Sequence, residues 1–319
     1  MSKKSKLVIA VHSADIDGLG SAALFLRFHK LINSKKEIKV FFRSVNEMLT
    51  SEEEFDYTFD LPKTENVKIN IDHHYSNYNR LINENRLSPS DLVDPSSPAA
   101  AKLVYEYFFI NDDVKKDRIA REIRDLSIAA DSGGLPDEFR VLDYLIKWYG
   151  DSDVMLRKIV EVIANNGYDS IKHPWILEKY KQFRKILIKT QELVNKFFQK
   201  VHDLPEILFL DTNGAIAGKL AKEVVLHSFS RNVVLLAIFS YSTRDKMYAV
   251  SFRVRKENQN MFDVMDLAEK LGGGGHPMAS AARGENQEDF IEKIGTELKA
   301  IAVNHGLGYK YLRMADYIG

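Results

Sequence analysis

The sequence contains no cysteine, which excludes disulfide bonds, thiolate metal sites and thiol nucleophiles. None of its apolar runs approaches the length of about 20 residues that a helix needs to span a membrane. The short apolar run at residues 7–11 is broken at once by His12 and Asp15, so we expect no signal sequence. It also has no net charge, since 45 Lys and Arg balance 45 Asp and Glu. Binding to nucleic acid would therefore require a local basic patch on the surface. We therefore expect a soluble, cytoplasmic protein without membrane contact.

The first half of the chain alternates strand patterns with helix patterns. The strand patterns lie at residues 6–12, 38–44, 55–60 and 67–72, and the helix patterns at 18–33, 97–109 and most of 113–170. Ser97 and Pro98 occupy the positions of an N-cap and a first helical residue. Such alternation predicts an α/β fold with a parallel sheet.

A long helix is predicted at residues 174–201, where no glycine or internal proline interrupts the pattern. A smaller α/β unit follows, with strands at 206–211, 232–239 and 246–254 and helices at 214–228, 261–271 and 286–304. With 319 residues the chain can hold two cores, and we predict domains at 1–172 and 205–319 joined by a helical linker at 173–204. Residues 172–200 carry eight Lys and Arg against two Glu. A solvated helix face explains this excess more simply than a basic substrate surface, although both remain open.

Three of the strand patterns end in histidine or aspartate. The residues at these ends are His12, Asp15, Asp17, Asp60, Asp72, His73 and His74. Open α/β sheets bind ligands at the carboxyl edge of their strands, and mixed carboxylate and imidazole ligands suit metals such as manganese. Asp131, which follows an apolar helical pattern, is placed to complete such a site.

Two divalent ions explain this cluster better than ordinary turns do. Each aspartate taken alone is equally well explained as a turn residue or a helix cap. Several aspartates gathered without a counter-charge would raise one another's pKa and destabilise the fold. Two ions about 3.5–4 Å apart remove that cost and support in-line phosphoryl displacement.

A dinucleotide-binding turn at Gly18 and Gly20 is the rival interpretation, with Arg43 meeting a 2′-phosphate. It is disfavoured because the third glycine is missing and because Asp15 and Asp17 would repel a pyrophosphate. The glycines are better explained by a tight turn from the metal loop into the helix.

A second candidate site lies in the C-terminal half. Its residues are Arg253, Gly272, Gly273, Gly274, Gly275 and His276. Consecutive glycines can expose backbone N–H groups to an anion, and an arginine at a strand end can grip a phosphate with two bonds. The remaining histidines stand outside any motif, and we expect structural or surface roles for His29, His173, His202, His227 and His305.

Together these motifs, in this order, resemble the DHH phosphoesterase superfamily, which joins a DHH domain to a DHH-associated C-terminal domain. The resemblance covers nearly the whole chain. The length is most similar to the stand-alone oligoribonucleases (nanoRNases) that also remove phosphate from 3′-phosphoadenosine 5′-phosphate. The family's membrane-anchored cyclic-di-AMP phosphodiesterases and its RecJ-like exonucleases carry additional segments, and family II pyrophosphatases lack the Gly-Gly-Gly-His end.

The resemblance implies roles for single residues. It places His12, Asp15 and Asp60 on one metal and Asp17, Asp60, His73 and Asp131 on the other, with Asp60 bridging. It places His74 beside the scissile phosphate and makes Asp72 an orienting residue, with the C-terminal candidate site holding the nucleotide. The first loop is one residue shorter than the family's common His-x-x-x-Asp-x-Asp form, and residues 277–281 are a variant of the pocket segment.

We therefore interpret the chain as a phosphodiesterase or exonuclease that uses two divalent ions, with Mn²⁺ expected and Mg²⁺ or Co²⁺ as alternatives. Its expected substrates are short single-stranded RNA or DNA, or nucleotide phosphates. A RecJ-like exonuclease on longer strands is the first alternative, supported by Trp175, Tyr180 and Phe183 on the basic helix. A catalytically silent nucleotide-binding protein is the second. The sequence is compatible with a homodimer and leaves polarity and substrate length open.

Overall fold

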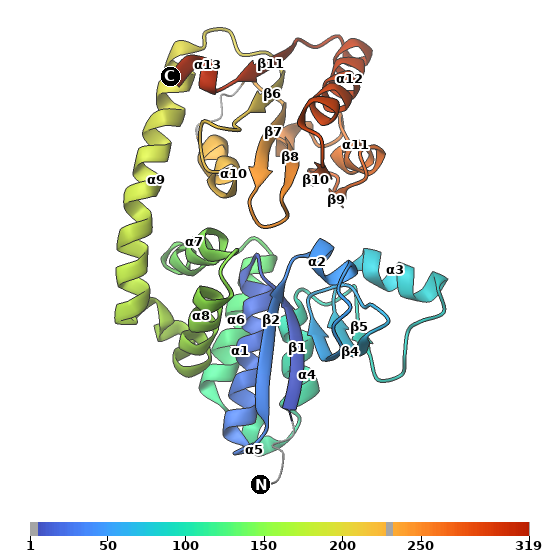
Figure 1. Ribbon diagram of the computed structural model, residues 1–319, viewed down its shortest axis with the longest axis vertical. Coiled ribbons are helices and arrows are strands. Elements are labelled where there is room, and N and C mark those ends of the chain that lie inside the picture. Colours follow the sequence, from blue (N-terminus) through green and yellow to red (C-terminus); the bar gives the residue numbers. More distant parts are fainter. Residues whose placement is uncertain (1–5, 228–231, 319) are drawn as a thin grey trace. The chain divides into compact units, whose positions relative to one another are not determined.

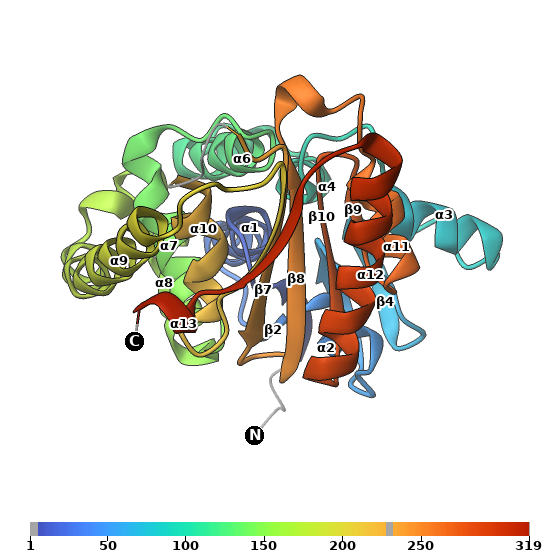
Figure 2. The same ribbon diagram turned by 90° about the horizontal axis from the view of Figure 1, so that it is seen from above.

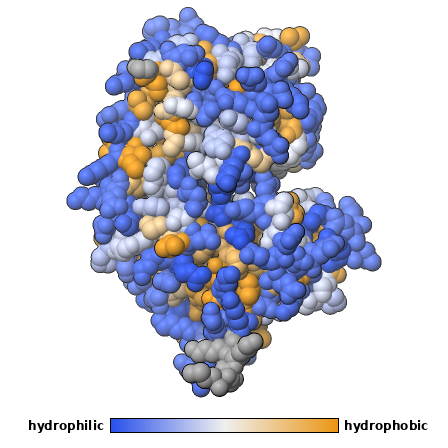
Figure 3. Space-filling view, viewed as in Figure 1, coloured by the Kyte–Doolittle hydropathy of each residue, from blue (hydrophilic) through white to orange (hydrophobic). Residues whose placement is uncertain are grey.

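The computed structural model describes residues 6–227 and 232–318, and the chain divides into two compact units, Met1–Gln182 and Phe183–Gly319 (Figure 1). Helix α9 (Pro174–Lys200) contains the point of division and confirms the predicted long helix to within one residue. The face drawn in Figure 3 is mostly hydrophilic. Of the helices in the described ranges, none combines the length and apolarity needed to cross a bilayer.

A parallel sheet with strand order β2-β1-β3-β4-β5 forms the centre of the N-terminal unit. Its strands are β1 (Lys6–His12), β2 (Glu37–Arg43), β3 (Phe55–Phe59), β4 (Val67–Asp72) and β5 (Leu92–Val93). Val11 pairs with Phe59, and Phe59 pairs with Ile71. The next residues along these strands therefore emerge side by side, and they are His12, Asp60 and Asp72. The predicted α/β class and the shared sheet edge are both confirmed.

Helix α1 (Ile16–Leu31) contacts α4 (Ala100–Phe108), α6 (Arg118–Asp131) and α8 (Asp153–Asn166). A Cβ added at Gly20 would lie 2.1 Å from Ser127 Oγ, so glycine permits the close approach of α1 and α6. This contact places Asp131, the last residue of α6, near the beginning of α1. The other helical segments are α2 (Val45–Leu49), α3 (Tyr75–Asn83), α5 (Asp112–Lys115), α7 (Arg140–Tyr149) and the 3₁₀ turns Asp137–Phe139 and Gly167–Lys172.

The beginning of α4 differs from the prediction. Ser97 is not its N-cap: the helix begins at Ala100, after Ala99, and Ser97 Oγ donates instead to the Ala99 carbonyl. The cap comes from a distant residue, because the Asp17 carboxylate accepts the N–H groups of Ala100 and Ala101 at 2.7 and 2.8 Å. A buried carboxylate on another helix thus replaces the local serine.

The C-terminal unit contains a mixed sheet with strand order β11-β6-β7-β8-β10-β9. Its strands are β6 (Ile207–Asp211), β7 (Leu235–Ser242), β8 (Met247–Val254), β9 (Gly274–His276), β10 (Ala279–Gly284) and β11 (Tyr309–Arg313). Helices α11 (Val264–Lys270) and α12 (Gln287–His305) lie on one side of the sheet, and α10 (Gly218–His227) lies on the other, as Figure 2 shows. The remaining helical segments of this unit are α13 (Ala315–Ile318) and the 3₁₀ turn Lys256–Asn258. The predicted helix at 214–228 begins only at residue 218, and residue 228 lies outside the described residues.

The glycine run takes part in a β-hairpin that the sequence did not predict. Gly274 pairs with Ala281, and Gly275 with Ser280, where strands β9 and β10 run antiparallel. A Cβ at Gly275 would lie 2.6 Å from Ser280 Cα, and its φ of +146° favours glycine. Close strand contact is one reason for glycine here, and anion binding by the backbone stays a prediction.

Candidate metal centre

The first strand and the turn that follows it bring His12 and Asp15 together. Asp15 caps helix α1 by accepting the Gly18 N–H at 2.9 Å, and its other carboxylate oxygen lies 2.8 Å from His12 Nδ1. A Cβ at Gly18 would lie 2.2 Å from the His12 carbonyl oxygen, so the tight turn requires glycine, as predicted. The same glycines therefore need no dinucleotide to explain them. Arg43, the other residue of that rival interpretation, pairs with Glu53 at 2.7 Å.

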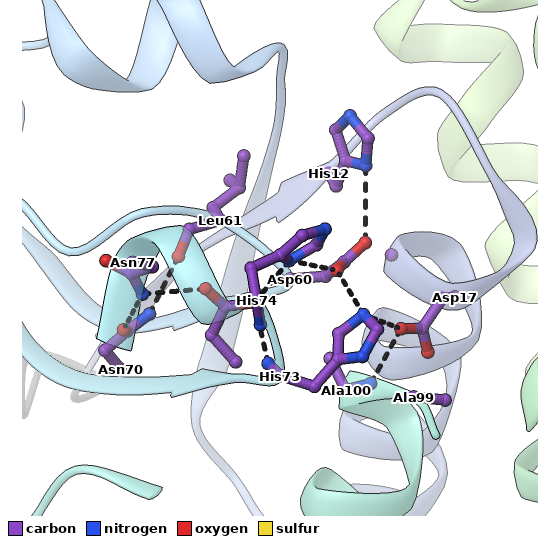
Figure 4. A network of polar contacts seen from close by, with 12 residues as sticks. His12, Asp17, Asp60, Leu61, Asn70, His73, His74, Asn77, Ala99 and Ala100 are labelled. Atoms are coloured by element: carbon purple, nitrogen blue, oxygen red, sulfur yellow. Dashed lines mark hydrogen bonds and ion pairs between the residues drawn. The ribbon is translucent and has the colours of Figure 1, made fainter. Parts of the chain in front are cut away.

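Asp60 lies at the centre of the cluster (Figure 4). One of its carboxylate oxygens is 3.3 Å from His12 Nδ1, and the other is 3.6 Å from His73 Nε2 and 3.5 Å from His74 Nδ1. Its backbone has a φ of +57°, a left-handed conformation that costs a non-glycine residue about 1–2 kcal/mol. The turn after β3 is thus held in a strained conformation that directs this carboxylate into the site.

His73 links Asp60 to a second group of acids. Its Nε2 lies 3.6 Å from a carboxylate oxygen of Asp17 and 3.6 Å from one of Asp131. The opposite ring nitrogen faces the Ser97 carbonyl oxygen at 3.3 Å. The ligand atoms form compact groups, namely His12 with Asp15 and Asp60, Asp17 with His73 and Asp131, and Asp60 with His73 and His74. All six predicted metal ligands thus converge, while metal binding itself stays a prediction.

The buried atoms at this centre lack the partners that they need. Asp60 Oδ1 and His73 Nε2 are both inaccessible to solvent, and neither has a hydrogen-bond partner among the residues that the structure describes. Buried polar atoms are rarely left in this state without an ion or a water. The donors are all nitrogen and oxygen, a set that manganese and magnesium accept. The site therefore fits divalent cations.

Electrostatics favour the same conclusion. Burial raises the pKa of Asp60 to about 6, and the Asp15 carboxylate adds to the shift. Burial, followed by the charges of Asp60 and Asp15, also holds the pKa of Asp17 well above its usual range. For His12, burial opposes the charged form, but the Asp15 and Asp60 carboxylates outweigh it and raise the pKa. Buried acids that repel one another in this way are stabilised by a cation placed between them.

His74 differs from the residues around it because half of its side chain is exposed. Its Nδ1 lies 2.8 Å from the Asp72 carboxylate. Burial lowers the pKa of His74, but the hydrogen bond and charge of Asp72 prevail and raise it to about 9. His74 therefore carries a proton at neutral pH in the metal-free protein, with Nδ1 held by Asp72.

Two of the residues predicted to bind substrate share one row of the C-terminal sheet. Arg253 pairs with Ala279, and Ala279 pairs with His276. Directly opposed residues on neighbouring strands point to the same face of the sheet. Arg253 and His276 therefore lie on that face on either side of Ala279, and their backbones are two strand spacings, about 10 Å, apart. Arg253 donates to the Phe252 carbonyl at 2.6 Å, whereas His276 is exposed. Substrate binding by this row stays a prediction.

The sequence analysis missed two functional candidates, Asn70 and Asn77. Both are buried and hydrogen-bonded to the cluster, directly or through one another. The available signal was an amide, Asn70, between Ile69 and Ile71 in an otherwise apolar strand end. A polar residue at a buried strand position requires partners nearby.

Comparison with known proteins identifies one domain directly. Residues 206–303 match the DHHA1 domain. Comparison with curated protein sequences gives no match.

Solved structures share the fold over most of the chain. A pGpG-specific phosphodiesterase, PggH from Vibrio cholerae, is 18% identical with a TM-score of 0.59, over 94% of this chain and 99% of that one. An exopolyphosphatase-related protein from Bacteroides fragilis is 15% identical with a TM-score of 0.53, over 93% and 92%. RecJ from Thermus thermophilus, in complex with Mn²⁺, is 14% identical with a TM-score of 0.54, over 98% of this chain but 54% of RecJ. The DHHA1 match at residues 206–303 and the fold shared with these structures agree with the resemblance to the DHH superfamily that the motifs indicated.

Proposed function

We propose that the protein is a metal-dependent phosphodiesterase that hydrolyses short oligonucleotides or nucleotide phosphates. The observation that supports this most strongly is the position of Asp60. Its two carboxylate oxygens face different ligand groups, one toward His12 and the other toward His73. A carboxylate shared in this way suits a site that holds two ions for phosphoryl transfer.

Each residue of the cluster has a proposed task. His12, Asp15 and Asp60 would hold one divalent ion, and Asp17, Asp60, His73 and Asp131 would hold the other. Bound there, the ions would supply Lewis-acid activation of a water and would neutralise charge on the phosphoryl group. Mn²⁺ is the proposed ion, and the RecJ structure with Mn²⁺ supports this choice.

His74 would act on the substrate itself. Because Asp72 holds its Nδ1, its Nε2 is the nitrogen left to donate a proton or a hydrogen bond. A phosphoryl oxygen or the leaving oxygen is the proposed acceptor. Arg253 and His276 would bind the nucleotide part of the substrate through charge-assisted hydrogen bonds.

A dinucleotide is the best first substrate to test. PggH, which shares the fold over nearly its full length, is a pGpG-specific phosphodiesterase. The RecJ of Thermus thermophilus is longer, and this chain spans only about half of it. Short substrates therefore fit this chain better than long strands do.

The test is an assay of the metal-depleted protein, with and without added Mn²⁺, on pGpG and on end-labelled RNA and DNA of increasing length. We expect no turnover after chelation, recovery with Mn²⁺, and the highest kcat/KM on the shortest substrates. Full activity after exhaustive chelation would contradict the metal mechanism. Preference for long strands would favour the RecJ-like alternative, and binding without hydrolysis would favour a silent nucleotide-binding protein.

A further inference from the structure

A buried network of amide side chains lies behind the metal cluster. Asn77, on α3, is 4% exposed, and Asn70, on β4, is 0% exposed. The side-chain amide of Asn77 donates to Asp72 Oδ2 at 2.7 Å and to Asn70 Oδ1 at 2.9 Å (Figure 4). None of the metal-ligand roles above includes either asparagine. Both nevertheless connect to the residues that carry those roles.

Asn77 fixes one side of the Asp72 carboxylate. The other oxygen of Asp72 accepts the His73 backbone N–H at 2.8 Å and His74 Nδ1 at 2.8 Å. A carboxylate held at both oxygens cannot rotate, so the bond from Asn77 determines the direction in which Asp72 presents its second oxygen to His74.

Asn70 fixes the turn that carries Asp60. Its amide donates to the Leu61 carbonyl at 2.9 Å and to Thr58 Oγ1 at 3.0 Å. Leu61 directly follows Asp60 in the chain, and Thr58 precedes it by two residues. This pair of bonds clamps the turn in which Asp60 adopts its left-handed conformation.

The orientation of the Asn77 amide follows from its partners. Its carbonyl oxygen accepts the Lys63 N–H at 3.2 Å and a guanidinium N–H of Arg80 at 3.2 Å, while its nitrogen faces two acceptors. A flipped amide would oppose donor to donor and acceptor to acceptor. The donated bonds therefore run in one direction from Arg80, at the outer end of the network, through Asn77 to Asp72, which also accepts from His74.

We propose that Asn70 and Asn77 are positioning residues that hold Asp60 and His74 in a fixed relation to each other. The inference rests on the proposed phosphodiesterase function, because it assigns the network to the geometry of that site. Two loops carry the reactive residues, one after β3 and one after β4, and the asparagine pair is a direct link between them. Loss of the pair leaves every predicted ligand in the sequence, and the backbone bond from Asp60 to Ile71 as well, but removes the side-chain links that fix the two loops relative to each other.

Three variants separate positioning from packing. Asn77→Ala removes the whole amide, and Asn70→Ala removes the clamp on the Asp60 turn. Asn77→Asp keeps the shape and the acceptor oxygen, removes both donated bonds and places a second carboxylate against Asp72. If donation to Asp72 and Asn70 is what matters, Asn77→Asp should lose at least as much kcat as Asn77→Ala, because its charge also repels Asp72; wild-type kcat would show that these bonds have no part in catalysis.

The matched control is Arg27→Met, in the same unit and outside the network. Arg27 makes two hydrogen bonds to Asp117, at 3.0 and 2.7 Å, and both side chains are mostly buried. Its loss should destabilise the same unit without touching the cluster. Arg80→Met, at the outer end of the network, should give a smaller effect than the Asn77 variants.

The measurements are kcat and KM on pGpG with Mn²⁺, the melting temperature, and the Mn²⁺ affinity from titration of the metal-free protein. We expect the Asn77 variants to lose about 10- to 100-fold in kcat, with KM within about twofold, and Asn70→Ala to weaken Mn²⁺ binding about 10-fold or more. Arg27→Met should melt lower while keeping kcat and Mn²⁺ affinity.

Variants that melt lower but keep both wild-type kcat and wild-type Mn²⁺ affinity would overturn the positioning role and leave the proposed function intact. If the wild-type protein does not hydrolyse pGpG, the proposed substrate fails, and Mn²⁺ affinity then decides the inference by itself. Should an alanine variant fail to fold, Asn77→Asp and Arg80→Met give the same comparison.

Discussion

Asp60 illustrates how one carboxylate serves two neighbours. It lies between His12 and His73, is almost fully buried, and has one oxygen with no hydrogen-bond partner in the described parts of the chain. In the metal-free protein this arrangement is unfavourable, because the pKa of Asp60 rises to about 6 through burial and the charge of Asp15. With two divalent ions bound, the same features would supply the proposed shared ligand.

The variant Asp60→Asn tests this balance. A neutral amide has the same size but cannot balance two ions, so we expect kcat to fall at least 10²–10³-fold, the effect of losing one electrostatic group. The metal-free melting temperature should stay the same or rise, because repulsion with Asp15 and Asp17 is relieved. Bound manganese per chain, kcat and the metal-free melting curve should be measured on one preparation. Near-normal turnover with two ions bound would remove Asp60 from the mechanism.

Asp17 is a predicted ligand of a different kind, because it also holds a helix. Its carboxylate accepts the N–H groups of Ala100 and Ala101 and so caps α4 from α1. At the scale of secondary-structure elements, the proposed metal site and the packing of two helices therefore share one side chain. In the metal-free protein the hydrogen bonds between Asp17 and α4 stabilise the fold, whereas the repulsion of Asp17 with the other acids of the cluster destabilises it.

We expect Asp17→Ala to lower the metal-free melting temperature, in contrast to Asp60→Asn. The substitution leaves two buried N–H groups without an acceptor, and each costs about 1–3 kcal/mol, whereas Asp60→Asn leaves the Asp60 backbone bond to Ile71 intact. Removal of the buried Asp17 charge opposes this loss but restores no hydrogen bond. Chemical denaturation of both variants in the presence of a chelator gives the comparison. An Asp17→Ala protein as stable as Asp60→Asn would show that the cap contributes little.

Helix α6 provides a pH-dependent element away from the site. Asp117 caps this helix by accepting the Ala120 N–H at 2.8 Å and also pairs with Arg27. Burial raises the pKa of Asp117, but the bonds from Arg27 and Ala120 outweigh it, and the net shift is downward. A carboxyl with a lowered pKa stabilises the fold above its unfolded pKa of about 3.9 and loses this contribution as the pH falls through the folded value.

The variant Asp117→Asn should therefore be less stable than wild type at pH 7, by about 1–2 kcal/mol for the weakened cap and ion pair. The difference should shrink as the pH falls below about 4, where the wild-type carboxyl also becomes neutral. Denaturant titrations across this pH range measure it, with kcat as the control because Asp117 lies outside the metal cluster. A difference that is constant with pH would mean that the charge of Asp117 has no part in the effect.

These elements also show how far the sequence could predict the structure. Apolar runs that end in His or Asp predicted β1, β3 and β4 almost to the residue, since their signal is local. The start of α4 was predicted wrongly because its true cap, Asp17, lies 83 residues away. Strand β9 was missed because its Gly-Gly-His sequence has no apolar alternation and forms only against β10. The role of Asn70 depends on Asn77, a partner on another element, which no local pattern reveals.

At the scale of the whole molecule, the two kinds of candidate site lie in different units. All six predicted metal ligands belong to Met1–Gln182, and the row of Arg253 and His276 belongs to Phe183–Gly319. If the first unit performs the chemistry and the second binds the nucleotide, substitutions in the two units must change different measured properties. Metal content should respond only to the first unit, and substrate affinity mainly to the second.

Arg253→Ala and His276→Ala test this division. If the two residues bind the substrate as proposed, each variant removes a hydrogen bond to a charged phosphate, worth about 1.5–3 kcal/mol, so we expect kcat/KM to fall roughly 10- to 100-fold, mostly through KM. Bound Mn²⁺ per chain should remain at the wild-type value, because neither residue belongs to a ligand group. Lys310→Ala is a suitable control, since this exposed residue lies on β11, at the sheet edge opposite β9, and should change neither quantity. Loss of metal from the Arg253 or His276 variant would contradict the division, and an unchanged KM in both would remove this row of the sheet from substrate binding.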